Sequence, residues 1–246
     1  MNITALCSLA ALENLPDASI DAMVSILPRD VSPVSQQDLG LLFNEDQRLA
    51  SAGPRSPVPW RTCARVLKPG GHALVATPSG DMDVIGMALR LAKFEIRDAI
   101  LVETASVHVP VLLARTQLAT KSLIENIRHH GAGALNIAAT RVLPTDDEVI
   151  LGIAEPEGRW PTNLVHDGSP AVENAMRERR RGPSKARFFT SLVADSVADR
   201  PATALARHLL RLAVPPGGVV LDPFAATDLV GHAAASLGVR AVLVRR

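Results

Sequence analysis

The sequence predicts an α/β protein built on a doubly wound, mostly parallel sheet. Short apolar runs rich in β-branched residues alternate with stretches of helical periodicity, and turns containing glycine or proline separate them. The last thirty residues also read as one complete strand–helix–strand unit. With 246 residues and an apolar fraction of 47%, the chain is long enough for one large domain that carries an insertion.

The terminal unit predicts where a ligand would bind. Residues 219–221 form a short buried strand, residues 229–237 have helical spacing, and residues 241–244 form a second strand. Asp228 or Thr227 is expected to cap the helix. In open parallel sheets, ligands bind at the carboxyl ends of the strands, which here means the loop after residue 221.

The rest of the chain divides into a sheet-forming part and an interrupted part. Up to residue 103 strands and helices alternate, but from 104 to 170 they do not. We therefore predict an α/β domain from residues 1–103 and 186–246, with an inserted region from 104–185. The strands expected before the terminal unit are residues 3–6, 22–27, 72–77, 99–102 and 107–113, and the helices are 36–50, 60–67, 81–93, 121–130 and 202–212.

Bulk composition excludes several classes of partner. A net charge of +1 provides no global attraction to nucleic acid or membranes, and no apolar run approaches the ~20 residues that span a bilayer. Cys7 and Cys63 lack the spacing of a zinc site, so no metal is expected. We expect a cytoplasmic protein without a membrane partner. The 3% aromatic content weighs against base stacking.

The loop after residue 221 resembles the cofactor motif of DNA amino-methyltransferases. The motif residues are Asp222, Pro223, Phe224 and Ala225, preceded by Leu221. The resemblance implies a methyltransferase fold of the Rossmann-like type, S-adenosylmethionine as cofactor and DNA as partner. The family continues with Gly-Ser-Gly-Thr-Thr, whereas residues 226–230 read Ala-Thr-Asp-Leu-Val. Alternatively, Asp222 is kept as a structural cap of its loop.

Residues 15–21 resemble the segment that precedes the family's catalytic tetrapeptide. The tetrapeptide itself, Asp/Asn/Ser-Pro-Pro-Tyr, is replaced by Ile26, Leu27, Pro28 and Arg29. In the family, its first side chain accepts a hydrogen bond from the target amine, and its last stacks on the extruded base. Ile26 cannot accept a hydrogen bond, so we expect no catalytic residue here, and the same residues also read as a core strand.

Two longer stretches resemble a subgroup of phage and bacterial DNA amino-methyltransferases. Residues 133–142 read GALNIAATRV, and residues 158–169 read GRWPTNLVHDGS. The resemblance places them on the target-recognition side. It also implies the permuted class, in which the catalytic motif precedes the cofactor motif.

A basic run follows this region. Its members are Arg177, Arg179, Arg180, Arg181 and Lys185. Such a run can bind phosphates through counterion release, or it can be a solvated helix end.

Two further replacements concern the cofactor. Asp228 brings a negative charge to where the methionine carboxylate is expected, which is a like-charge contact. Arg245 stands where the family has an acidic residue that binds the ribose. Together with Ile26, three separate chemical roles are altered.

Three functional hypotheses follow. The first is a catalytically degenerate, DNA methyltransferase-like protein without cofactor, acting as a non-catalytic subunit, scaffold or DNA-positioning partner, for instance beside an active methyltransferase chain. The second is an active, S-adenosylmethionine-dependent adenine-N6 or cytosine-N4 methyltransferase in which Ser25, Asp30 or Asp228 accepts from the amine. The third is a phage structural or assembly protein, found in the host cytoplasm or the virion. Each is compatible with an oligomer.

Overall fold

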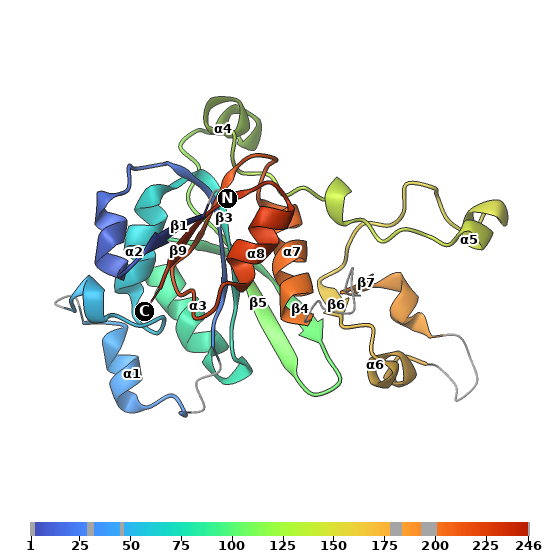
Figure 1. Cartoon of the computed structure of the whole chain (residues 1–246), viewed down its shortest axis with the longest axis horizontal. Helices are drawn as coiled ribbons and strands as arrows, with labels where there is room; N and C mark the ends of the chain where they lie inside the picture. The colour runs from blue at the N-terminus through green and yellow to red at the C-terminus, as the bar shows by residue number, and fades with distance from the viewer. Residues whose placement is uncertain (1–2, 29–31, 45–46, 178–183, 193–200, 246) are drawn as a thin grey trace.

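The chain folds around one nine-stranded sheet in the order β1-β9-β8-β2-β3-β5-β4-β6-β7 (Figure 1). The computed structural model describes residues 3–28, 32–44, 47–177, 184–192 and 201–245. All strand pairs in this part are parallel except those that β5 makes with β3 and β4. The doubly wound, mostly parallel α/β fold predicted from the sequence is confirmed.

The strands follow the apolar runs, and the helices follow the periodic stretches. The strands are β1 Ile3–Leu6, β2 Ile20–Ile26, β3 Leu67–Ala76, β4 Glu95–Glu103, β5 His108–Arg115, β6 Leu164–His166, β7 Thr190–Ser191, β8 Val219–Asp222 and β9 Arg240–Val244. The helices are α1 Gln36–Leu41, α2 Pro57–Val66, α3 Met82–Leu91, α4 Leu123–His130, α5 Asp146–Ile150, α6 Pro170–Ala175, α7 Pro201–Ala213 and α8 Leu229–Ser236.

Alternate residues of β2 supply the two layers of the core. Ala22 and Val24 pack in the cluster that contains buried residues of α7 and α8. Met23 packs in a second cluster with residues of α2 and α3, including the fully buried Trp60. Helices therefore cover both faces of the sheet, which explains why β2 is apolar at nearly every position.

Two predictions of local structure are wrong. The helix expected over residues 36–50 ends at Leu41, because a capping box stabilises only its first turn. In this box the side chains of Ser35 and Asp38 each accept a hydrogen bond from the backbone N–H of the other residue. The strand expected over residues 72–77 begins earlier, at Leu67, because residues 68–71 continue it as a bulge opposite β2. Gly70 has a φ of +78°, which suits glycine.

The stretch 104–185 contributes more to the sheet than its sequence suggests. Strand β5 pairs with β3 and β4, and the three-residue β6 extends the sheet beside β4. The division into a domain and an inserted region stays a prediction. Beyond the sheet, residues 142–160 project from the body as an arm, seen on the right of Figure 1.

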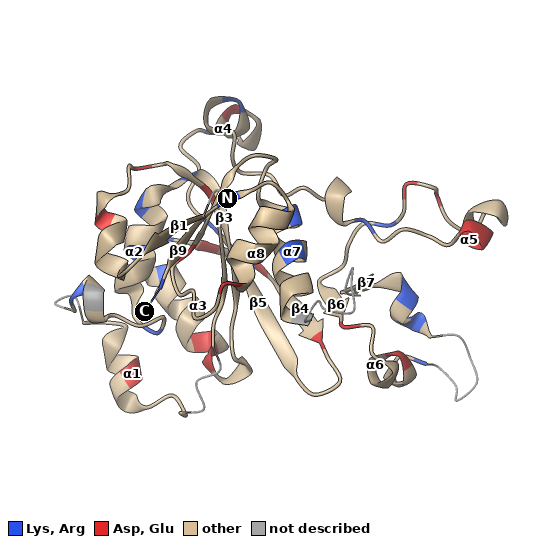
Figure 2. Cartoon of the chain, in the orientation of Figure 1, with Lys and Arg blue, Asp and Glu red and all other residues tan. Residues whose placement is uncertain are grey.

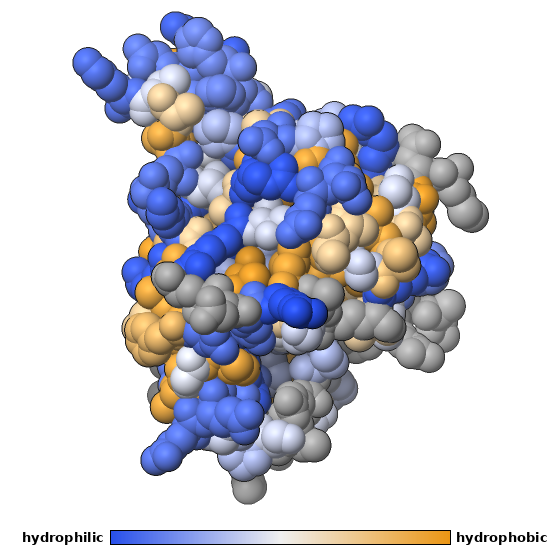
Figure 3. All heavy atoms as spheres, turned by 90° about the vertical axis from the view of Figure 1, so that its left-hand side faces the viewer, coloured by the Kyte–Doolittle hydropathy of each residue, from blue (hydrophilic) through white to orange (hydrophobic). Residues whose placement is uncertain are grey.

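The face opposite the arm mixes hydrophilic and apolar side chains (Figure 3). Among the residues described, no helix combines the length and the apolar character required to cross a bilayer.

Candidate functional site

The two loops that carry the resemblance meet at one edge of the sheet. Strands β8 and β2 are parallel neighbours, with Val220 opposite Ala22 and Leu221 opposite Met23. Both strands therefore end at the same edge, so the loop after Asp222 and the segment after Ile26 lie side by side. This is the edge at which the topology of open α/β sheets predicts a ligand.

Asp222 ties these two strands together. Its side chain is buried, and its Oδ1 accepts hydrogen bonds from Ser25 Oγ at 2.7 Å and from the Phe224 backbone N–H at 3.1 Å. Burial raises the pKa of Asp222 to about 6, although the two hydrogen bonds act in the opposite direction. An aspartate that caps its loop structurally is expected to accept hydrogen bonds of this kind.

The next three motif residues face the core. Pro223, Phe224 and Ala225 are all buried. The Phe224 ring contacts Trp60 edge-on, with 5.0 Å between ring centroids, and Trp60 Nε1 donates to the Pro54 carbonyl at 2.8 Å. Phe224 therefore anchors the loop to α2, whereas Ala225 packs in the other core cluster, with residues of α7 and α8.

Asp228 and Arg245 form an ion pair across the mouth of this site. Arg245 Nη2 donates to Asp228 Oδ1 at 2.8 Å, and both side chains are about half exposed. Asp228 occupies the N-cap position of α8, as predicted, but its side chain makes no capping bond. The charges of Asp228 and Arg245 thus neutralise each other.

Sequence reasoning treated these two replacements separately and missed their pairing. A signal was present, because the replacements have opposite charges and both follow strands expected to be neighbours. The backbone agrees with the pairing, since the Ala225 N–H donates to the Val244 carbonyl at 3.1 Å.

The loop also accommodates the loss of its glycines. No residue from 222 to 228 has a positive φ, so Ala226, Thr227 and Asp228 adopt ordinary backbone conformations. Their side chains are exposed. The loop as folded does not need glycine, which alone tolerates positive φ readily.

The segment that replaces the catalytic tetrapeptide offers little polar chemistry. Ile26 is half-buried, Leu27 is buried and Pro28 is exposed, while Arg29 and Asp30 lie outside the described residues. The Leu27 N–H donates to the Ala76 carbonyl at 3.0 Å, which continues the ladder with β3.

A buried arginine network borders this segment. Arg55, 8% exposed, pairs with Asp81 at 2.9 Å and Asp38 at 3.1 Å. The hydrogen bonds that Arg55 donates to the Asp81 carboxylate raise the pKa of Arg55. A cavity of about 270 Å³ lies between this network and the side chains of Leu27 and Pro28.

The basic run lies at the other end of the sheet. Arg177 and Lys185 are exposed beyond β6, whereas Arg179, Arg180 and Arg181 lie outside the described residues. In Figure 2, blue ribbon segments mark Lys and Arg on this side of the molecule. The structure does not bring Arg177 or Lys185 to the Asp222 loop.

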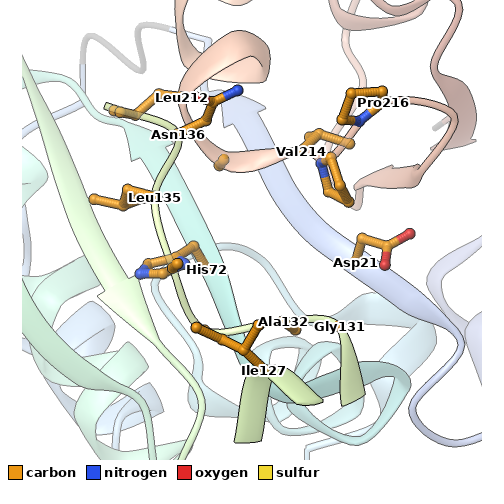
Figure 4. A pocket seen from close by; sticks show the side chains of 14 residues that line it. Asp21, His72, Ile127, Gly131, Ala132, Leu135, Asn136, Leu212, Val214 and Pro216 are labelled. Carbon is orange, nitrogen blue, oxygen red and sulfur yellow. The ribbon is translucent and has the colours of Figure 1, made fainter. Parts of the chain in front are cut away.

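A second cavity, of about 260 Å³, opens at the amino ends of the strands (Figure 4). It is lined by the start of the GALNI stretch, residues 133–136, and by the buried side chains of Asp21 and His72. Asp21 accepts from the Val219 N–H at 2.8 Å and pairs with Lys68 at 2.5 Å. The GALNI stretch therefore begins away from the edge that carries Asp222.

In the described part of the chain, no three His, Cys, Asp or Glu side chains are grouped so that they could hold a metal ion. Burial, followed by the nearby Asp222 carboxylate, raises the pKa of Cys63, so its thiol stays protonated and unreactive.

Comparisons with solved structures agree with this architecture. A proposed DNA modification methylase of Thermus thermophilus, TTHA0409, solved with S-adenosyl-L-methionine, is 18% identical, with a TM-score of 0.53, over 100% of this chain and 89% of that one. M1.HpyAVI is 12% identical, with a TM-score of 0.54, over 99% and 91%. The PvuII cytosine-N4-specific DNA methyltransferase is 14% identical, with a TM-score of 0.54, over 100% and 82%. At such identities the likeness shows the fold.

The family of the chain is shown by its sequence, not by the solved structures. No curated protein sequence matches the chain significantly. The family model described as DNA methylase, of the N6/N4 type, matches residues 58–244, which is more than half of the chain. The match includes the Asp222 loop and begins after the segment at residues 15–29, and the protein belongs to this DNA methylase family.

Proposed function

We propose that this DNA methylase family member is catalytically degenerate and acts as a non-catalytic subunit, scaffold or DNA-positioning partner. The observation that carries the proposal is the ion pair between Asp228 and Arg245. By resemblance, these positions hold a glycine beside the cofactor carboxylate and an acidic ligand of the ribose. The residues present do not fit S-adenosylmethionine at either position.

The chemistry of the pair explains the misfit. The Asp228 side chain occupies space that a glycine leaves open to the cofactor, and the Arg245 guanidinium, which carries donors only, cannot accept hydrogen bonds from the ribose hydroxyls. The pair is about half exposed, so its own contribution to stability is about 0–1 kcal/mol. Its importance therefore lies in the ligand that it disfavours.

The alternative acceptors for a target amine also favour the degenerate reading. Ser25 is fully buried and its hydroxyl donates to Asp222. Asp228 is engaged by Arg245. Asp30 lies outside the described residues, so an active enzyme would depend on that one candidate.

Calorimetric titration of the full chain with S-adenosylmethionine tests the proposal. We expect no saturable binding at millimolar cofactor and no transfer of a labelled methyl group to a mixed DNA pool. The PvuII enzyme provides the positive control for both measurements. Saturable binding together with methyl transfer would refute the proposal.

A reversion variant shows whether the named residues are responsible. The combination Ala226→Gly, Thr227→Ser, Asp228→Gly and Arg245→Glu restores the first three residues of the family's loop pattern and the acidic residue after β9. We expect it to bind S-adenosylmethionine without gaining methyl transfer, because Ile26 still offers no acceptor. A matched control with Arg240→Glu, at the start of β9, should not bind.

A further inference from the structure

The arm is an ordered structure that projects from the body of the chain (Figure 1), and its contacts with that body include the Arg187–Glu148 ion pair and the Arg159 guanidinium, which lies 4.3 Å from the centre of the Phe188 ring. Its base is closed by two backbone hydrogen bonds between Val142 and Arg159, at 2.9 and 3.0 Å. Gly158, with a φ of +77°, permits this closure, because a Cβ there would lie 2.5 Å from the Val142 carbonyl oxygen. Near the tip, Thr145 and Glu148 form a reciprocal cap on α5. The arm is therefore shaped by specific contacts.

The tip of the arm presents large apolar side chains to solvent. Ile150 is 80% exposed, Leu151 69% and Ile153 61%. Leu143 and Trp160, near the base, are equally open. Five of the twelve large apolar side chains exposed in the described part of the chain thus lie within residues 143–160. A concentration of this kind marks a contact surface.

The charge of the arm excludes nucleic acid as the occupant of its tip. Residues 143–158 contain five acidic and no basic side chains. They are Asp146, Asp147, Glu148, Glu155 and Glu157. A DNA backbone would be repelled by such a segment, whereas a basic protein surface with an apolar floor would be attracted.

A surface of that description lies at the base of the same arm. A hollow of about 820 Å³ is rimmed by Arg141, Arg177 and Arg187, and its lining includes apolar side chains of Leu143 and Phe189. The acidic arm and the arginines of the hollow already form an ion pair within one chain, because Arg187 pairs with Glu148 of α5 at 2.6 Å.

We infer that two copies of this chain associate through their arms, with the apolar, acidic tip of each arm seated in the arginine-rimmed hollow at the base of the other. A two-fold axis makes any such contact reciprocal, so two antiparallel arms satisfy both tips and both hollows at once. This inference does not depend on the proposed loss of catalysis.

Sedimentation velocity of the full chain tests the association. We expect a reversible dimer that weakens as salt concentration rises, since charged pairs contribute to it. Leu151→Asp should raise the dissociation constant about tenfold or more, as expected for a central apolar contact. Ile124→Asp, which alters an exposed apolar residue of α4, is the matched control and should leave the dimer unchanged.

A charge exchange identifies the two surfaces. Arg177→Glu alone and Asp147→Arg alone should each weaken the dimer, and the two together in one chain should restore much of it. A chain that is monomeric at all salt concentrations would overturn the inference. So would equal effects of Leu151→Asp and Ile124→Asp, or duplex DNA binding in the hollow, lost in Arg177→Glu, without any dimer.

Discussion

Replacing Asp222 by asparagine is expected to stabilise the protein at neutral pH, and the gain should grow as the pH rises. Burial raises the pKa of Asp222 from 3.8 to about 6. The folded state therefore binds this proton more tightly than the unfolded state does. The stability that the protonated carboxyl provides is fully present below about pH 3.8 and is lost as the pH rises through about 6. At about pH 7.5 the ionised carboxylate costs about 3 kcal/mol.

Asparagine retains an acceptor oxygen for Ser25 and Phe224 but carries no charge. Urea unfolding of Asp222→Asn and the unmodified chain should show an advantage that increases by about 1.5 kcal/mol between about pH 5 and about pH 8. Asp228→Asn, at an exposed position of the same loop, should change stability by no more than about 0.5 kcal/mol. A pH-independent loss of stability in Asp222→Asn would contradict the expectation.

Replacing His72 by phenylalanine should protect the protein against acid. Burial, together with the charges of Arg115 and Arg97, lowers the pKa of His72 from 6.5 to about 4. The folded state thus resists protonation of this ring, and the stability it provides is present above about pH 6.5 and lost as the pH falls through about 4. The unmodified chain should lose about 2 kcal/mol from this source by about pH 5.

Denaturant unfolding at about pH 7 and about pH 5 separates this effect from packing, because phenylalanine fills a similar volume in the cavity wall. The difference in stability between the two pH values should shrink by about 2 kcal/mol in His72→Phe. His129→Phe, on the exposed side of α4, should leave it unchanged. If His72→Phe loses as much stability on acidification as the unmodified chain, the expectation is wrong.

Much of the sheet was predictable because its strands and helices have distinct apolar periods. The run at residues 219–221 and the periodic stretch at 229–237 were located by that rule, and both are present as β8 and α8. Strands β6 and β7 could not be predicted by this rule, because a run of two or three residues is too short to show a period. Their place is determined by pairing with β4 and with each other.

The site was predictable only in part. The structural use of Asp222 follows from local turn chemistry, as its bond to the Phe224 N–H illustrates. The bond from Ser25, 197 residues away, and the pairing of Asp228 with Arg245 depend on which strands become neighbours. The exposure of the apolar residues of the arm is revealed only by the fold.

The pairing of Asp228 with Arg245 also constrains how this lineage can change. A single substitution at either position leaves the other side chain as a lone charge beside the loop. The two positions should therefore change together, with related sequences carrying both charged residues or neither.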